Sequence, residues 1–248
     1  MTHSGSRKRL FFAVWLSGLP GIVAVTWLVL PALVADRSLP MPIWALQMAA
    51  AAQSAVLLGA AAAVGTFLAH QVNLIAPVYS ALINGTTILG PLRAQALPGV
   101  VGGSFGAAMI WAFTLLAPAP LLQLSNQFPM PAAARLLYGG ITEELLLRWG
   151  LMTLLLWLLW RFVQRRKRIP SGFLVAVAIA SSAVLFGVGH LPAASAMIGE
   201  LTLGVSAYLV AANASFGLIA GWLFWRYGLE SAIIAHITVH AILIATSQ

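Results

Sequence analysis

Long apolar runs, separated by short polar breaks, recur along most of the chain. Runs of roughly 20 apolar residues are typical of helices that cross a bilayer. The pattern predicts an all-α polytopic membrane protein with about eight transmembrane helices. The predicted spans cover residues 10–33, 43–69, 98–122, 132–162, 171–189, 196–211, 213–226 and 229–246. Residues 70–96 are more polar and contain Pro77 and Pro91, so this stretch is predicted to be a loop with a partial or re-entrant helix.

The composition agrees with this class of protein. Of the 248 residues, 61% are hydrophobic and only 7% are charged, whereas soluble domains carry about 25% charged residues. We therefore expect one membrane-embedded domain over residues 1–248, with the chemistry-bearing region at 132–248. The chain contains no cysteine, which excludes disulfides and thiolate catalysis.

The net charge of +8 is concentrated in two places. Arg7, Lys8 and Arg9 precede the first span, and a second basic cluster occupies residues 161–168. Basic residues favour the cytoplasmic side of a membrane. With eight spans, both clusters and both termini are predicted to be cytoplasmic, in an inner membrane. No soluble domain remains to carry a nucleic-acid site, so we expect the bilayer and no nucleic acid as a partner.

Two adjacent acidic residues interrupt one of the most apolar runs, "TEELLLR". Ionisable side chains within a membrane are costly, and by default they mark functional sites. Glu144 and Arg148 are four residues apart, so they share a helix face and can pair. Glu143 lies about 100° around the helix from Glu144. Its carboxylate is therefore predicted to stay free for chemistry, although all three residues could instead form a structural ion network.

Three histidines occur in other apolar runs. His190 ends the run "FGVGH", and His236 and His240 share one helix face in "HITVH". Glu143 lies about 27 Å along its helix from the basic loop, and His190 lies about 28 Å from it. We expect the last helix to enter from the face opposite that loop. All these residues would then reach a similar depth and form a single site.

A carboxylate and several imidazoles suit two kinds of hydrolysis. Glu143 could take a proton from water while a histidine shares or relays it. Alternatively, Glu143, His190, His236 and His240 could ligate a metal such as zinc, which lowers the pKa of bound water. Two other classes remain open: an ion- or proton-coupled transporter that uses the same residues, and a catalytically silent scaffold.

Two further polar residues receive simpler interpretations. Glu200 is predicted in a span, where it could line the same cavity or start a helix near the interface. Asn213 is predicted to cap the following helix.

The three motifs in this order and spacing resemble those of the CAAX prenyl protease and bacteriocin-processing (CPBP) intramembrane proteases. The resemblance covers residues 143–240 and implies an eight-helix intramembrane endopeptidase. It implies that Glu143 is the catalytic base and that His190 is its partner in activating water. Glu144 and Arg148 would support Glu143, and His236 would contact the substrate carbonyl or the oxyanion.

The sequence departs from this family at His240, where many members have asparagine. Histidine can donate a hydrogen bond to an oxyanion, but it can also ligate a metal, so glutamate-dependent and metal-dependent mechanisms both remain open. The family includes prenyl-protein endopeptidases, whose lipidated substrates are cytosolic. Because the predicted site lies toward the other face, we expect a membrane-associated or lipid-anchored peptide substrate near the extracytoplasmic side.

Overall fold

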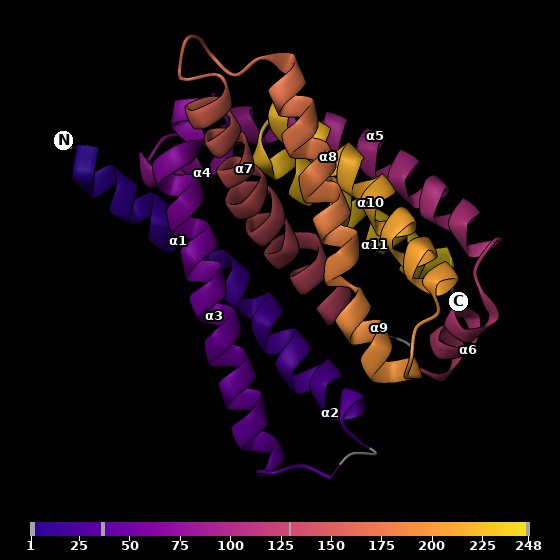
Figure 1. Ribbon diagram of the computed structural model, residues 1–248. Coiled ribbons are helices and arrows are strands. Elements are labelled where there is room, and N and C mark those ends of the chain that lie inside the picture. Colours follow the sequence, from indigo (N-terminus) through magenta and orange to yellow (C-terminus); the bar gives the residue numbers. More distant parts are fainter. Residues whose placement is uncertain (1–2, 36–37, 129, 247–248) are drawn as a thin grey trace.

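The computed structural model describes residues 3–35, 38–128 and 130–246, which form helices joined by turns, with no strand among them (Figure 1). This confirms the all-α class. The helices are α1 (His3–Ala24), η1 (Val25–Val29), α2 (Leu30–Leu33), α3 (Ile43–Leu68), η2 (Ala69–Val72), α4 (Pro77–Ile83), α5 (Leu89–Thr114), α6 (Ala119–Gln127), η3 (Ala134–Thr142), η4 (Leu145–Met152), α7 (Thr153–Leu158), η5 (Leu159–Val163), α8 (Gly172–Gly189), α9 (Leu191–Ile198), α10 (Leu203–Arg226) and α11 (Leu229–Thr246).

Seven of the helical segments in the described residues are long and apolar enough to cross a membrane, close to the predicted eight. The difference arises because the spans predicted at 196–211 and 213–226 are one helix, α10. The Thr202 hydroxyl caps its start by accepting a hydrogen bond from the Val205 amide at 3.3 Å. The seven spans are Gly5–Leu33, Ile43–Val72, Leu89–Thr114, Ala134–Val163, Gly172–Ile198, Leu203–Arg226 and Leu229–Thr246.

The odd number of spans changes the expected topology. With one crossing per span, the two termini lie on opposite faces, so the argument that placed both in the cytoplasm no longer applies. For the same reason α11 starts on the face that carries the 161–168 loop, and not on the opposite face as predicted. The basic N-terminus and this loop are still separated by an even number of spans, so they remain on one face.

The third span starts earlier than predicted. Helix α5 begins at Leu89 and not near residue 98, because Pro91 falls in its first turn, where proline costs no hydrogen bond. Gln95, which falls in the stretch predicted to be a loop, is buried in a helix junction. Its side-chain amide donates to the Tyr227 carbonyl at 2.8 Å, and its oxygen accepts from the Ser231 amide at 3.2 Å.

The fourth span contains the acidic motif and departs from ordinary α-helical geometry. It is π-helical over η3, η4 and η5, and Glu143 and Glu144 lie between the first two of these segments. π-Helices are rare, and they occur frequently at functional sites. The sequence predicted one continuous helix over 132–162, and it gave no sign of this widened geometry.

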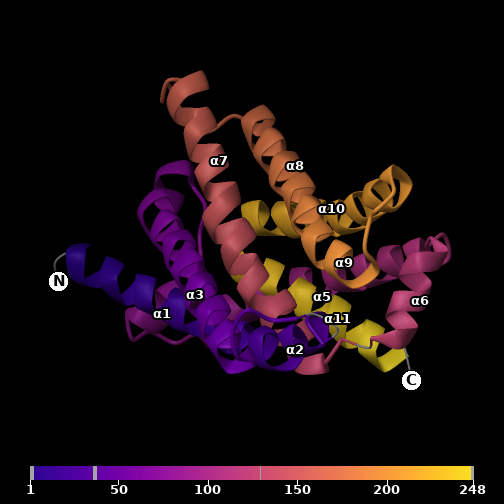
Figure 2. The same cartoon turned by 60° about the horizontal axis from the view of Figure 1, so that its bottom comes forward.

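Glycines allow the helices that carry the site to approach closely. Helix α11 packs along α5, and a Cβ atom added at Gly103 would lie 2.5 Å from the Ala235 carbonyl oxygen. Helix α8 packs along α10 in the same way at Gly187, beside the Val210 carbonyl. Small residues commonly mediate such contacts between membrane helices. The second view shows α7, α8, α10 and α11 grouped together, with α1 and α3 beside them (Figure 2).

Candidate active site

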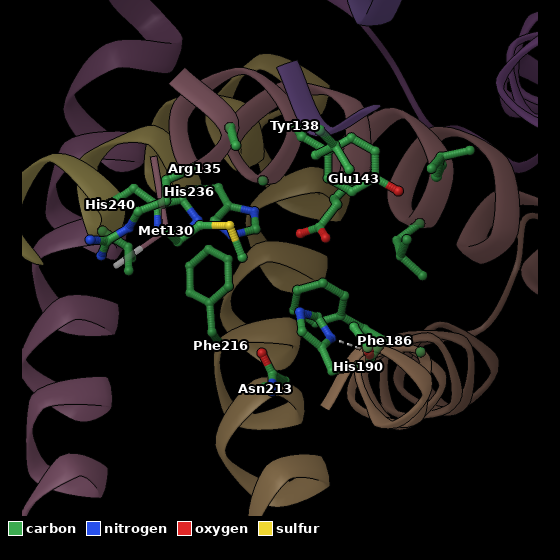
Figure 3. A pocket seen from close by; sticks show the side chains of 18 of the residues that line it. Met130, Arg135, Tyr138, Glu143, Phe186, His190, Asn213, Phe216, His236 and His240 are labelled. Carbon is green, nitrogen blue, oxygen red and sulfur yellow. Dashed lines mark hydrogen bonds between the residues drawn. The ribbon is translucent and has the colours of Figure 1, made fainter. Parts of the chain in front are cut away.

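A cavity of about 510 Å³ lies between six of the spans. It is surrounded by the C-terminal part of the first span, Ile110 of the third, the start of the fourth, the end of the fifth, the middle of α10 and the second half of α11. Its walls are mainly apolar. Its polar lining comes from Arg135, Tyr138, Glu143, His190, Asn213, His236 and His240 (Figure 3). All six predicted site residues are thus close to one another: four of them line the cavity, and Glu144 and Arg148 lie together behind its wall.

The two adjacent glutamates have different environments. Glu143 is partly exposed, lines the cavity and forms no ion pair with any residue that the structure describes. Glu144 is completely buried, behind the cavity wall. This separation follows from the turn of the helix between consecutive residues. Glu143 is the single carboxylate among the residues that line the cavity in the described structure.

Glu144 joins two other residues in a buried polar network. Its Oε2 lies 3.2 Å from Arg148 Nε, which confirms the predicted pair, and both side chains have no exposed surface. Its Oε1 accepts a hydrogen bond from His236 Nδ1 at 2.9 Å. The Arg148 guanidinium also lies over the Phe186 ring, 5.3 Å from its centroid. The network connects η4, α8 and α11 at the back of the cavity.

The hydrogen bonds of two histidines fix which ring nitrogen remains for chemistry. His190 Nδ1 donates to the Phe186 carbonyl at 2.8 Å, and His236 Nδ1 donates to Glu144. Since both acceptors are oxygens without hydrogen, Nδ1 carries the proton in each ring. The Nε2 atom of each ring is therefore the one left for a water or a substrate in the cavity.

His240 has no such hydrogen bond. Its ring stacks on that of His236, with centroids 4.8 Å apart and an interplanar angle of 21°. Its Nδ1 is buried without a hydrogen-bond partner. A Cβ atom at Gly139 would lie 2.5 Å from its Nε2, so η3 admits this ring because residue 139 is glycine. The position that departs from the family pattern thus remains part of the cavity wall.

The predicted zinc ligands do not form a metal site in this arrangement. Among the residues that the structure describes, no three His, Asp or Glu side chains are placed so that they could hold one metal ion. Nδ1 of His236 is hydrogen-bonded to the Glu144 carboxylate, an arrangement found in many metal-bound histidines. The other predicted ligands are not placed to bind the same metal ion.

The structure adds residues that the sequence interpretation missed. Asn213 was predicted to cap a helix, but it lies within α10 and lines the cavity, with its Nδ2 donating to the Leu209 carbonyl at 2.9 Å. Arg135 and Tyr138 also line the cavity. Glu200 lies in the turn between α9 and α10 and does not line it. Arg135 could have been found from its position, two turns before Glu143 on the same helix.

Comparison with known families agrees with this site. Residues 125–242 match the family described as type II CAAX prenyl endopeptidase Rce1-like. This matched part, just under half of the chain, is similar to members of that family. The matched region contains all six predicted site residues, whereas the first span, which completes the cavity, lies outside it. No curated protein and no solved structure matches the chain.

The similarity to the Rce1-like family bears on the class of protein. It supports an intramembrane endopeptidase of the general CAAX type, and hence a hydrolase that acts on membrane-associated protein substrates. The seven apolar spans agree with an integral membrane protein. Neither the family nor the fold supports the transporter interpretation.

Proposed function

We propose that the protein hydrolyses a peptide bond in a membrane-associated or lipid-anchored substrate, with Glu143 as the general base. The observation that carries this proposal is the unequal environment of the two glutamates. Glu144 is buried and bonded to Arg148 and His236, while Glu143 faces the cavity and has no ion-pair partner within the described part of the chain. A carboxylate free of structural partners is available to accept a proton from water.

The reaction can be written from the residues around the cavity. Glu143 takes one proton from a water molecule, and Nε2 of His190 accepts a hydrogen bond that orients the same water. The water oxygen attacks the substrate carbonyl, and a protonated His236, stabilised by the Glu144 carboxylate, donates Nε2–H to the developing oxyanion. Glu143 then transfers its proton to the departing amine, and the C–N bond breaks. His240, stacked on His236, is placed as a further oxyanion contact.

The cavity walls support a substrate that carries an apolar group. Most residues around Glu143 are aliphatic or aromatic, and an apolar pocket binds an apolar side chain or an acyl chain. The first span contributes much of this surface, although it lies outside the matched family region. The apolar lining includes Val25, Val29, Leu33, Ile110, Leu146, Leu147 and Leu185.

Hydrolysis by water makes a prediction about oxygen. Purified protein in proteoliposomes, incubated with lipid-anchored peptides in water enriched in ¹⁸O, is expected to release fragments with one ¹⁸O atom in the new carboxylate. Mass spectrometry of the fragments locates the cleaved bond and the label together. Intact peptides after long incubation would contradict the proposed function. Cleavage without the label would contradict direct attack by water.

We further propose that the cavity opens toward the extracytoplasmic half of the membrane. If each span crosses the membrane once, ten of the 13 basic residues lie on the same face as the N-terminus. The cavity lies toward the opposite face. By the positive-inside rule this face is cytoplasmic. The ten are Arg7, Lys8, Arg9, Arg93, Arg161, Arg165, Arg166, Lys167, Arg168 and Arg226.

The absence of cysteine makes this topology testable by labelling. A membrane-impermeant maleimide is expected to react with Glu200→Cys in intact cells, because Glu200 lies in an exposed turn after the fifth span. The Lys167→Cys variant, in the loop after the fourth span, should react only after the membrane is permeabilised. The reverse pattern would place the cavity toward the cytoplasm, where prenylated tails are found.

A further inference from the structure

One cation on the cavity wall has no acidic partner among the described residues. Arg135 lies near the start of η3, is partly buried and lines the cavity. The acidic residues of the described chain are Glu143, Glu144, Glu200 and Glu230. None of them forms an ion pair with Arg135, because Glu144 pairs with Arg148 and Glu230 Oε1 accepts from the Tyr79 amide. The Arg135 side chain also makes no hydrogen bond within the described residues.

This arrangement is unusual for the chain. The basic residues at the N-terminal face can reach water and lipid headgroups, and the buried Arg148 has a carboxylate beside it. Arg135 instead projects into a mainly apolar cavity, where an unpaired charge is costly. An anionic group that entered the cavity would remove this cost, and it would form charge-assisted hydrogen bonds with the planar guanidinium.

The position of Arg135 relative to Glu143 defines where such an anion would lie. Arg135 and His240 occupy one end of the cavity, while Glu143 and His190 lie toward the other (Figure 3). Arg135 and Glu143 are eight positions apart on one helix, which is about 12 Å at the rise of an α-helix and less along the wider π-helical segment η3. An extended peptide covers roughly 3.3–3.6 Å per residue. A group bound at Arg135 is therefore within about four residues of a bond placed at Glu143.

We propose that Arg135 is a specificity-determining residue that binds a substrate carboxylate located within about four residues of the cleaved bond. The inference rests on the proposed function and deepens it, since it selects anionic segments from among membrane-associated peptides. The carboxylate can belong to the end of a chain or to an acidic side chain, because both offer the same two oxygens to the guanidinium. Nothing in the catalytic step requires this charge, so its effect falls on the choice of substrate.

The test compares matched lipid-anchored peptides in the same proteoliposomes. One pair differs only in a free or amidated C-terminal carboxyl group, and a second pair, amidated throughout, differs in an internal Glu or Gln at each of the four positions beside the cleaved bond. The wild type is expected to prefer the anionic member of at least one pair by about 10- to 100-fold in kcat/KM, as for one charge-assisted hydrogen bond. The pair that shows the preference identifies the source of the carboxylate.

Variants of Arg135 then test whether the preference for anionic peptides depends on this residue. Arg135→Gln is expected to bring the ratio of anionic to neutral peptide close to one, and Arg135→Lys to retain part of it. Arg135→Glu should reverse it, favouring a peptide with Lys at the same position. Arg168→Gln, in the basic loop, is the matched control and should keep the wild-type ratio. Asp36 lies outside the described residues, so Asp36→Asn is included and should also keep it.

The outcomes separate this inference from the proposed function. Equal cleavage of anionic and neutral peptides by the wild type, or an unchanged ratio in Arg135→Gln, overturns the role of Arg135 and leaves the hydrolase intact. If Asp36→Asn lost the preference for anionic peptides, the charge of Arg135 would serve the fold, and its role in binding a substrate carboxylate would also be overturned. If the wild type cleaves no peptide of either kind, the proposed function itself fails.

Discussion

Replacing Glu143 with glutamine is expected to lower kcat by about 10²- to 10⁴-fold, the usual contribution of a general base. Glutamine keeps the shape of the side chain but cannot accept a proton from water. Glu143 forms no ion pair, so the substitution breaks no structural contact of that kind. The loss should appear in kcat, because the carboxylate acts in the transition state, while KM should change little. Steady-state cleavage of a lipid-anchored peptide measures both constants.

Two matched variants define this result. Glu200→Gln removes an acidic residue outside the cavity, and it is expected to retain wild-type activity. Glu143→Gln should unfold at the wild-type temperature, which separates lost chemistry from misfolding. If Glu143→Gln in the folded protein keeps more than about a tenth of the wild-type kcat, Glu143 is not the general base.

Most of the helices could be predicted from the sequence, because a membrane span requires a long run of apolar residues, and such runs are visible in the order of the residues. The errors came where polarity was interpreted locally. Asn213 was read as a helix cap, yet its side chain bonds to a carbonyl of its own helix, so α10 continues through it. Gln95 falls in the stretch predicted to be a loop, but its partners are Tyr227 at the end of α10 and Ser231 in α11, far along the chain.

Within the site, contacts between neighbours in sequence were predictable, and contacts between helices were not. The spacing of Glu144 and Arg148 predicted their pair, which the structure confirms. The bond from His236 to Glu144 connects residues 92 positions apart, and no local pattern indicates it. The position of His240 against Gly139 likewise depends on how α11 packs on η3. The catalytic roles of the six residues remain predictions.

The same network joins stability to function. Glu144 is completely buried, so it must be paired to remain charged, and it accepts a hydrogen bond from His236, which lines the cavity. In the proposed mechanism its charge holds the His236 ring with Nδ1 protonated and supports an imidazolium at the oxyanion. A change at Arg148, which does not line the cavity, is therefore expected to affect the reaction through Glu144.

The second large effect is expected at Arg148. Arg148→Met should destabilise the protein by about 3–5 kcal/mol, because it leaves Glu144 buried without its cation. The methionine fills much of the same space, so the loss reflects charge more than packing. Equilibrium unfolding in mixed micelles, followed by circular dichroism, measures this change. In contrast, Arg168→Met alters an exposed residue of the basic loop and should change the free energy of unfolding by about 0.5 kcal/mol or less.

A double variant separates the two contributions to that loss. If the penalty comes from an unpaired carboxylate, then adding Glu144→Gln to Arg148→Met should recover part of the stability, because the remaining buried groups are neutral. Activity should not recover, since His236 would lose the carboxylate that supports its protonated form. Equal stability of the single and double variants would show that Arg148 acts through its packing against Phe186, and not through its charge.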